Sequence, residues 1–156
     1  MFGHSISDAA GIEVEPQVVG FLVALVEALR PRYVIETGCY HGTTSAAIGE
    51  ALIVGSLDTM DIDSYSVELA TAFTQGLPVT VHHCASLDFT PSQPIDLAFL
   101  DSDPDIRLHE LEHFAPYLAP DAIVAIHDSR DLPQPKEGWR WVNLPTPRGL
   151  LLVQAG

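Results

Sequence analysis

The stretch Val34-Ile35-Glu36-Thr37-Gly38-Cys39-Tyr40-His41-Gly42-Thr43-Thr44 decides the fold of this chain. It begins with apolar and β-branched residues, which favour a short buried strand over residues 33–36. Gly38 and Gly42 then bracket a turn, and a helix is expected over residues 43–52. The turn lacks the third glycine of a dinucleotide site, and no lysine follows Gly42 as it would in an NTPase phosphate loop.

Helical and strand patterns alternate along the rest of the chain. The other helices are expected over residues 16–29, 66–75 and 106–118, and the other strands over 56–61, 79–82, 95–100, 122–126, 139–144 and 149–154. Such alternation predicts a parallel sheet with helices on both faces. The last two strands have no room for a helix between them and must pair antiparallel. We therefore expect an α/β fold: a doubly wound, mostly parallel, Rossmann-like sheet of seven strands with a C-terminal antiparallel hairpin.

Composition narrows the class of protein further. The 156 residues suffice for one domain, and 7 Lys plus Arg stand against 21 Asp plus Glu, which gives a formal charge of −14. This acidic protein is expected to repel nucleic acid and anionic membrane surfaces. No apolar run could span a bilayer, no secretory signal pattern is visible, and only two cysteines occur. We therefore expect a cytoplasmic location.

Ligands of such open sheets bind at the carboxyl ends of the strands. The polar residues expected there are residues 36–42, Asp61, Asp63, Ser86, residues 101–103 and residues 127–129. Asp61 ends the second strand, where an acid accepts hydrogen bonds from a ribose diol. A glycine turn and a ribose acid without a phosphate cradle indicate a nucleoside cofactor such as S-adenosylmethionine (SAM). The alternative is a connecting turn with a solvated acid.

Five segments, in order along the chain, resemble small-molecule O-methyltransferases of the class I SAM-dependent fold. They are residues 36–45, 59–63, 85–88, 99–103 and 126–129. The resemblance implies that residues 1–156 form a single SAM-binding methyltransferase domain. The polar, glycine-bearing residues 1–12 are expected to be a mobile segment that orders over the ligand.

The same resemblance implies which residues bind the cofactor. The methionine end would meet the turn and the following helix, Asp61 would take the ribose hydroxyls, Ile62 would pack on the adenine, and Ser86 would bond its edge. The full implied set is Glu36, Gly38, Tyr40, Gly42, Thr43, Thr44, Asp61, Ile62, Ser86 and Asp101.

Transfer of a methyl group to a hydroxyl requires that the hydroxyl lose a proton, to a base or with the help of a metal. The resemblance places Asp101, His127 and Asp128 at the acceptor edge, and two alternatives stay open. Asp101 and Asp128 match acids that hold Mg²⁺ in the metal-dependent branch, although Ser129 stands where that branch has Asn or Asp. In the other alternative His127 is the general base and one of the acids orients it.

Other functions compete with this interpretation. His109-Glu110-Leu111-Glu112-His113 matches the H-E-x-x-H pattern of zinc hydrolases, but the expected helix turns Leu108, Leu111, Ala115 and Leu118 to the sheet and both histidines to solvent. The chain shows no inserted lid over an acceptor, so the stronger alternative is a SAM-binding module without catalysis or a partner subunit. For an enzyme we expect a small-molecule acceptor, with a homo-oligomer as one way to close the site.

Overall fold

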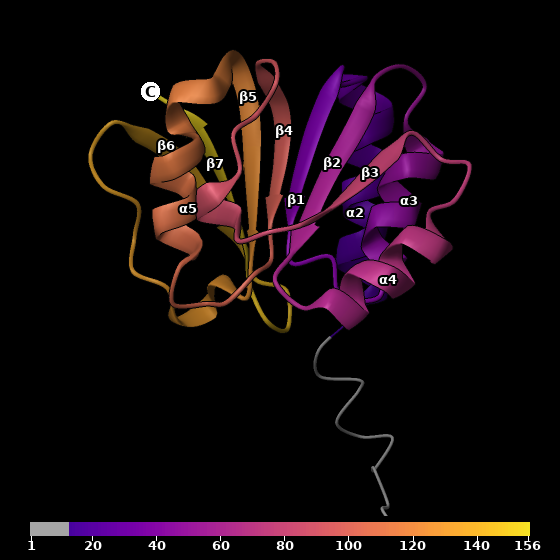
Figure 1. The fold of residues 1–156 in the computed structure, drawn as a ribbon. Coiled ribbons are helices and arrows are strands. Elements are labelled where there is room, and N and C mark those ends of the chain that lie inside the picture. Colours follow the sequence, from indigo (N-terminus) through magenta and orange to yellow (C-terminus); the bar gives the residue numbers. More distant parts are fainter. Residues whose placement is uncertain (1–12) are drawn as a thin grey trace, which may run out of the picture.

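The computed structural model describes residues 13–156 as one seven-stranded sheet with helices on both faces (Figure 1). The strand order is β3-β2-β1-β4-β5-β7-β6; β1 to β5 are parallel, and β7 is antiparallel to both β5 and β6. The elements are α2 (Pro16–Leu29), β1 (Tyr33–Thr37), α3 (Thr43–Ala51), β2 (Ser56–Asp61), α4 (Ser64–Phe73), β3 (Val79–His83), β4 (Ile95–Leu100), α5 (Arg107–Phe114), β5 (Leu118–His127), β6 (Trp139–Leu144) and β7 (Leu150–Ala155). The expected fold class is confirmed.

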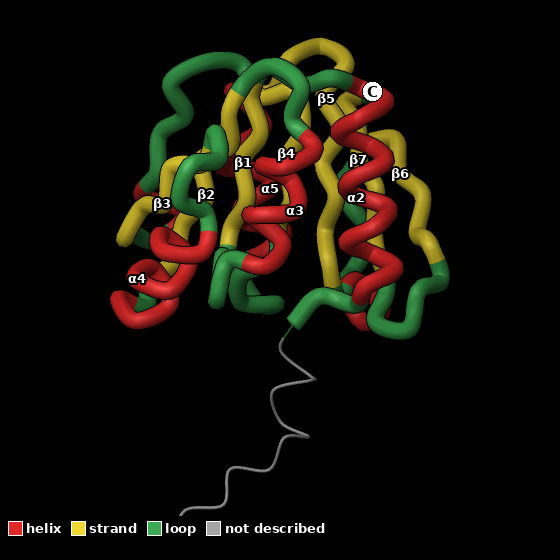
Figure 2. The backbone as a smooth tube through the Cα atoms, turned by 90° about the vertical axis from the view of Figure 1, so that its right-hand side faces the viewer, coloured by secondary structure: helices red, strands yellow, loops and turns green. Residues whose placement is uncertain are grey.

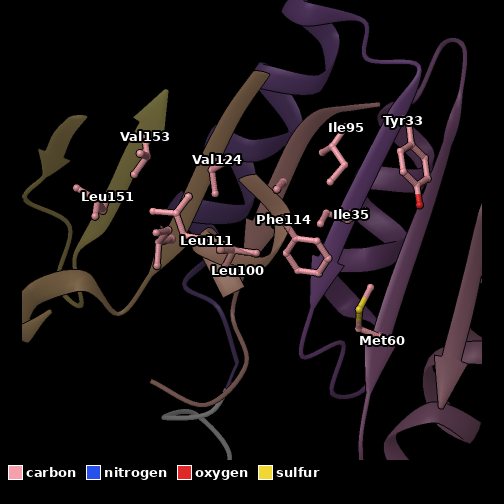
Figure 3. Packing of buried hydrophobic residues seen from close by; sticks show 12 residues of the cluster. Tyr33, Ile35, Met60, Ile95, Leu100, Leu111, Phe114, Val124, Leu151 and Val153 are labelled. Carbon is pink, nitrogen blue, oxygen red and sulfur yellow. The ribbon is translucent and has the colours of Figure 1, made fainter. Parts of the chain in front are cut away.

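Two apolar layers hold the helices to the sheet. The helices α2, α3 and α4 cover the face seen in Figure 2, where Leu22 of α2 packs against Phe99 of β4. On the opposite face Leu111 and Phe114 of α5 pack against Leu100 and other strand residues (Figure 3). Phe99 and Leu100 are adjacent and fully buried, so β4 is covered on both faces, as its continuous apolar sequence requires.

Several predicted boundaries agree with the structure. The bounds of α2, β2, β4 and β6 are those expected, and the terminal hairpin pairs as predicted. Helix α4 begins two residues earlier than expected, because the Asp63 carboxylate caps it by accepting the Ser66 N–H at 2.8 Å. Within residues 13–156, no helix is long and apolar enough to cross a membrane. The expectation for residues 1–12 lies outside the described residues.

The prediction for the helix over residues 106–118 was wrong in its end and in its buried face. Helix α5 ends at Phe114 and is followed by a 3-10 turn, because Pro116 has no N–H with which to continue the helix. Strand β5 consequently begins at Leu118, four residues before its predicted start. The buried residues of α5 are Arg107, Glu110, Leu111 and Phe114, whereas Leu108 is only partly buried.

Gly38 lets the end of β1 approach the end of β4. It has a φ of 74°, and a Cβ at this position would lie 2.5 Å from the Asp101 carbonyl oxygen. Its N–H donates to the Met60 carbonyl at 2.8 Å, which ties the turn to β2 as well. A side chain here would therefore force apart the three central strands at the edge where ligands bind.

We expect Gly38→Ala to destabilise the protein more than Gly76→Ala and to do so by at least about 2 kcal/mol, because positive φ alone costs roughly 1–2 kcal/mol. Gly76 has a φ of 84° but open space around it, so Gly76→Ala measures the cost of the positive φ alone, without a steric clash. Gly20, within α2 and also in open space, is the opposite control: Gly20→Ala should stabilise by about 0.5–1 kcal/mol. Urea unfolding measures all three, and equal losses for Gly38→Ala and Gly76→Ala would contradict the proposed close approach.

Candidate functional site

The glycine turn is fastened to the end of β2 by Asp61. One oxygen of this carboxylate, Oδ2, accepts the Tyr40 N–H at 3.0 Å, and Oδ1 accepts the Asp63 N–H at 3.0 Å. Tyr40 has a φ of 46°, a rare conformation for a non-glycine residue, which this hydrogen bond supports. Asp61 therefore sets the shape of the turn and also faces the cavity beside it.

A cavity of about 320 Å³ follows the strand ends from the glycine turn to the segment after β3. Six of the ten predicted cofactor residues line it: Gly38, Tyr40, Asp61, Ile62, Ser86 and Asp101. A smaller hollow beside the turn is lined by Thr43 and Thr44, together with Glu13 and Val14 ahead of α2. Glu36 and Gly42 line neither space; Gly42 packs instead against Ala70 of α4.

Glu36 lies behind the turn and is 1% exposed. Its Oε2 accepts hydrogen bonds from the hydroxyls of Ser45 and of Thr59, the latter at 2.7 Å. Burial raises the pKa of Glu36 to about 7, against the opposing effect of these two hydrogen bonds. Glu36 therefore joins β1, β2 and α3 beneath the turn.

Glu110, which sequence reasoning did not select for the cofactor site, lies beneath the far end of the 320 Å³ cavity. It is fully buried, and its carboxylate accepts hydrogen bonds from the hydroxyls of Ser86, Ser102 and Thr37. Burial is the largest effect on this group and raises the pKa of Glu110. The predicted adenine contact, Ser86, thus has its hydroxyl proton directed toward Glu110.

The predicted acceptor-edge residues meet in a cluster of buried charges. The ring of His127 is fully buried; Nδ1 lies 2.8 Å from Asp101 Oδ1, and Nε2 lies 2.5 Å from Glu15 Oε2. Burial opposes protonation, but the carboxylates of Asp101, Glu15 and Asp128 outweigh it and raise the pKa of His127. Burial by itself would raise the pKa of Glu15. A backbone hydrogen bond, His127 and the charge of Arg148 together outweigh burial, so the pKa of Glu15 is lowered.

Arg107 supplies the buried positive charge of this cluster. Its guanidinium lies 3.1 Å from Asp101 Oδ1 and 3.1 Å from Asp128 Oδ2, and it also donates to the backbone carbonyls of Ser102 and His127. Burial raises the pKa of Asp101, which His127 and Arg107 partly counter.

Arg148, in the turn between β6 and β7, holds Asp128 from the other side. Its Nε and Nη2 lie 2.5 and 2.8 Å from the two carboxylate oxygens, in a bidentate pair. Burial by itself would raise the pKa of Asp128. The positive charges and hydrogen bonds of Arg148, His127 and Arg107 outweigh burial and lower this pKa. Arg148 also donates to the Glu13 carbonyl at 2.9 Å and so connects the segment before α2 to the cluster.

This arrangement does not fit a divalent metal ion. Among the described residues, Asp101, His127 and Asp128 are the one group whose ligand atoms converge, all within 4.8 Å. Both oxygens of Asp128 are, however, engaged by guanidinium groups, and Asp101 Oδ1 is engaged by both His127 and Arg107. The guanidinium groups of Arg107 and Arg148 already neutralise these carboxylates. A metal ion would have to displace both arginines to bind here.

The H-E-x-x-H pattern does not form a zinc site in the described part of the chain. Glu110 is buried under the three hydroxyls, His109 is exposed, and His113 Nε2 lies 2.9 Å from the Phe89 carbonyl oxygen. The two histidines accordingly belong to no group of three ligands that converge.

Sequence reasoning missed four residues of the site: Glu15, Arg107, Glu110 and Arg148. One signal was available, because residues 107, 110, 111 and 114 have the spacing of a buried helical stripe. Arg107 and Glu110 in this stripe are charged, however, and charged residues are usually exposed. The more apolar stripe that contains Leu108 was therefore predicted to be the buried face. Nothing in the local sequence marks Glu15, which is 112 residues from His127.

Comparison with known proteins agrees with the fold. The model of a family described as "Methyltransferase domain" matches residues 35–129, and the chain belongs to that family. This confirms the expected resemblance to class I SAM-dependent methyltransferases and the enzyme class. The comparison with curated protein sequences gives no match.

Solved structures show the same fold at low sequence identity. The methyltransferase PaMTH1 from Podospora anserina, bound to SAH, is 14% identical with a TM-score of 0.83 and covers 95% of this chain and 82% of its own. An O-methyltransferase from Bacillus cereus, in complex with SAH, is 16% identical with a TM-score of 0.82 and coverages of 97% and 87%. The O-methyltransferase TomG from Streptomyces achromogenes, in complex with SAM, is 17% identical with a TM-score of 0.78 and coverages of 92% and 82%.

The buried Glu36 should make stability depend on pH. Its pKa is higher in the folded protein, about 7, than the ordinary 4.5, so its contribution is present below pH 4.5 and is lost as the pH rises to 7. Relative to Glu36→Gln, which cannot ionise, the wild type should lose up to about 3 kcal/mol over this range. Urea unfolding of both proteins at a series of pH values measures the difference, and a constant difference would show that Glu36 does not titrate there.

Proposed function

We propose that this protein transfers a methyl group from SAM to a hydroxyl oxygen of a small molecule. The observation that carries the proposal is spatial. The 320 Å³ cavity with its glycine turn and Asp61 shares Asp101 with the buried charge cluster of Asp101, His127 and Glu15. A cofactor site and a group able to hold a proton thus adjoin at one edge of the sheet, as methyl transfer to a hydroxyl requires.

The cavity suits the nucleoside of SAM. Asp61 lines it at the end of β2, where the ribose diol would donate to the carboxylate. Ile62, which is 74% exposed, offers an apolar surface to the adenine ring, and Ser86 lies beyond it. The methionine end would then lie by the turn, with its carboxylate at the start of α3 near Thr43 and Thr44. That some solved relatives bind SAM or SAH supports this placement.

In the transfer itself, the acceptor oxygen forms a bond to the methyl carbon while the carbon–sulfur bond of SAM breaks. The hydroxyl proton must leave, and we assign it to the Glu15–His127 pair. Glu15 Oε1 has no hydrogen-bond partner among the described residues and so has a lone pair for a proton. Because this atom is buried and Glu15 lines none of the three cavities at this edge of the sheet, the proposal requires that binding of the acceptor opens a path to it. The proton is then held on Glu15 Oε1, while Oε2 keeps its contact with His127 Nε2 and Asp101 holds the other side of the ring. Arg107 and Arg148 keep Asp128 ionised and in place.

A larger cavity of about 870 Å³ is the proposed place for the body of the acceptor. Its lining includes Asp128 and Arg148 of the charge cluster and continues along apolar side chains such as Leu108, Leu132 and Trp139. Asp105, Glu112, Asp131 and Lys136 also line it, so the acceptor we propose has an apolar body together with polar groups. A second copy of the chain is one way to close so open a site. The free thiols of Cys39 and Cys84 accord with the proposed cytoplasmic location.

Calorimetric titration of SAM and SAH into the purified protein tests the cofactor. Wild type should bind both, and Asp61→Ala should lose binding, since it removes the ribose acceptor and the hydrogen bond to Tyr40. Asp121→Ala, an exposed position at the opposite end of the sheet, should bind like wild type. A folded wild type that binds neither ligand would remove the basis for the proposal.

Glu15→Gln should lower kcat by roughly 10²–10⁴-fold, the usual contribution of a positioned base, and leave the Kd for SAM unchanged. Glu27→Gln is the matched control, because Glu27 is exposed on α2 and lines none of the three cavities. Methylation of a panel of phenols and alcohols should persist in EDTA. It should also rise with pH around a midpoint above 6.5, because the pKa of His127 is raised and the loss of its proton makes the adjacent Glu15 carboxylate a stronger base.

The same experiments separate an enzyme from a binding module. Loss of turnover in His127→Ala or Asp128→Asn with SAM binding intact would establish the catalytic edge. SAM binding without methylation of any acceptor, in wild type, would favour the binding module. Full activity in Glu15→Gln would contradict the assigned proton path.

A further inference from the structure

The hydroxyl protons around Glu110 have directions that the structure fixes. The Asp101 N–H donates to Thr37 Oγ1 at 3.1 Å, and Thr37 Oγ1 lies 3.1 Å from Glu110 Oε2. Because Thr37 already accepts a hydrogen bond, its own proton serves the carboxylate. Ser102 donates to Glu110 Oε1 at 2.6 Å, and Ser86 donates to the same oxygen. Above the raised pKa of Glu110 its carboxylate is ionised and can only accept, so all three protons then point toward Glu110.

Two of the residues that donate these hydrogen bonds also line the cavity. Ser86 and Ser102 line the 320 Å³ space where their side chains meet above Glu110, whereas Glu110 itself does not line it. With their protons committed to Glu110, the two serine oxygens present only lone pairs to a ligand. A hydrogen-bond donor on the ligand is accepted there, and an acceptor meets two unshared electron pairs.

We propose that Glu110, through Ser86 and Ser102, selects an adenine over a purine that carries an oxygen at position 6. The inference rests on the proposed function, which places the base of SAM at this end of the cavity. Adenine directs an amino group, a donor, from position 6, and hypoxanthine directs a carbonyl oxygen. Glu110 contacts no ligand; it is a positioning residue that determines which hydrogen-bonding group the serines offer.

The substitution Glu110→Gln reverses this pattern for a specific reason. The side-chain carbonyl of the glutamine must face Thr37, because the direction of the Thr37 proton is fixed by the Asp101 N–H. The amide nitrogen then faces Ser86 and Ser102 and donates one N–H to each. Both serines must turn their own protons away from the amide, toward the cavity, and become donors to the ligand.

The test compares the Kd values of SAH and of S-inosylhomocysteine, its position-6 oxygen analogue, by calorimetry. Wild type should bind SAH at least about tenfold more tightly, because the analogue leaves buried acceptors unpaired. In Glu110→Gln this preference should fall to about one or invert, with weaker SAH binding and tighter analogue binding. Glu112→Gln, on the exposed side of the same helix, should keep the wild-type preference.

The outcomes separate this inference from the proposed function. Failure of the wild type to bind SAH would contradict the proposed function. Binding of SAH with no preference over the analogue, or an unchanged preference in a folded Glu110→Gln protein, would overturn the inference alone. If Glu110→Gln does not fold, the double variant Ser86→Ala, Ser102→Ala provides the test. It keeps Glu110 but removes both serine hydroxyls, so the preference for SAH over the analogue should disappear. A retained preference would overturn the inference.

Discussion

The buried guanidinium of Arg107 is the interaction on which the functional edge depends. It is 2% exposed and binds, at one time, carboxylates from the ends of β4 and β5 and two backbone carbonyls. A buried charge is tolerable only when it is paired and hydrogen-bonded, and here the requirement is mutual. Asp101 and Asp128 could not stand so close without this cation, and the cation could not be buried without them.

Helix α5 extends this constraint to both ends of the edge. Arg107 and Glu110 lie one turn apart on its buried face, and each is held by groups from the strands. Arg107 organises the charge cluster at the proposed acceptor side, while Glu110 organises the hydroxyls beside the proposed cofactor cavity. The apolar contacts of Leu111 and Phe114 fix the helix against the sheet and thereby fix both polar groups (Figure 3). One short helix thus serves the two halves of the proposed reaction.

The sequence predicted the parts of the fold that repeat a simple pattern. Alternation of strands and helices, the glycine turn and the short terminal hairpin were enough to predict the topology, and the strand-end rule brought Asp61, Asp101, His127 and Asp128 to one edge. It could not predict Glu15 at His127, since that contact depends on how α2 packs across the sheet. It misplaced the buried face of α5 because a charged residue is ordinarily solvated, and only the partners on other strands make Arg107 and Glu110 buried.

Arginine in place of a metal changes what the edge can do chemically. A metal ion lowers the pKa of a bound hydroxyl and stabilises the resulting anion. The guanidinium of Arg107 is already saturated by two carboxylates and two carbonyls, and that of Arg148 by Asp128 and Glu13, so neither has much charge to offer an acceptor. In the proposed transfer to a hydroxyl, a base must then remove the proton. The one buried carboxylate oxygen without a hydrogen-bond partner among residues 13–156 belongs to Glu15. The charge pattern that disfavours a metal therefore also points to the Glu15–His127 pair as the proton acceptor.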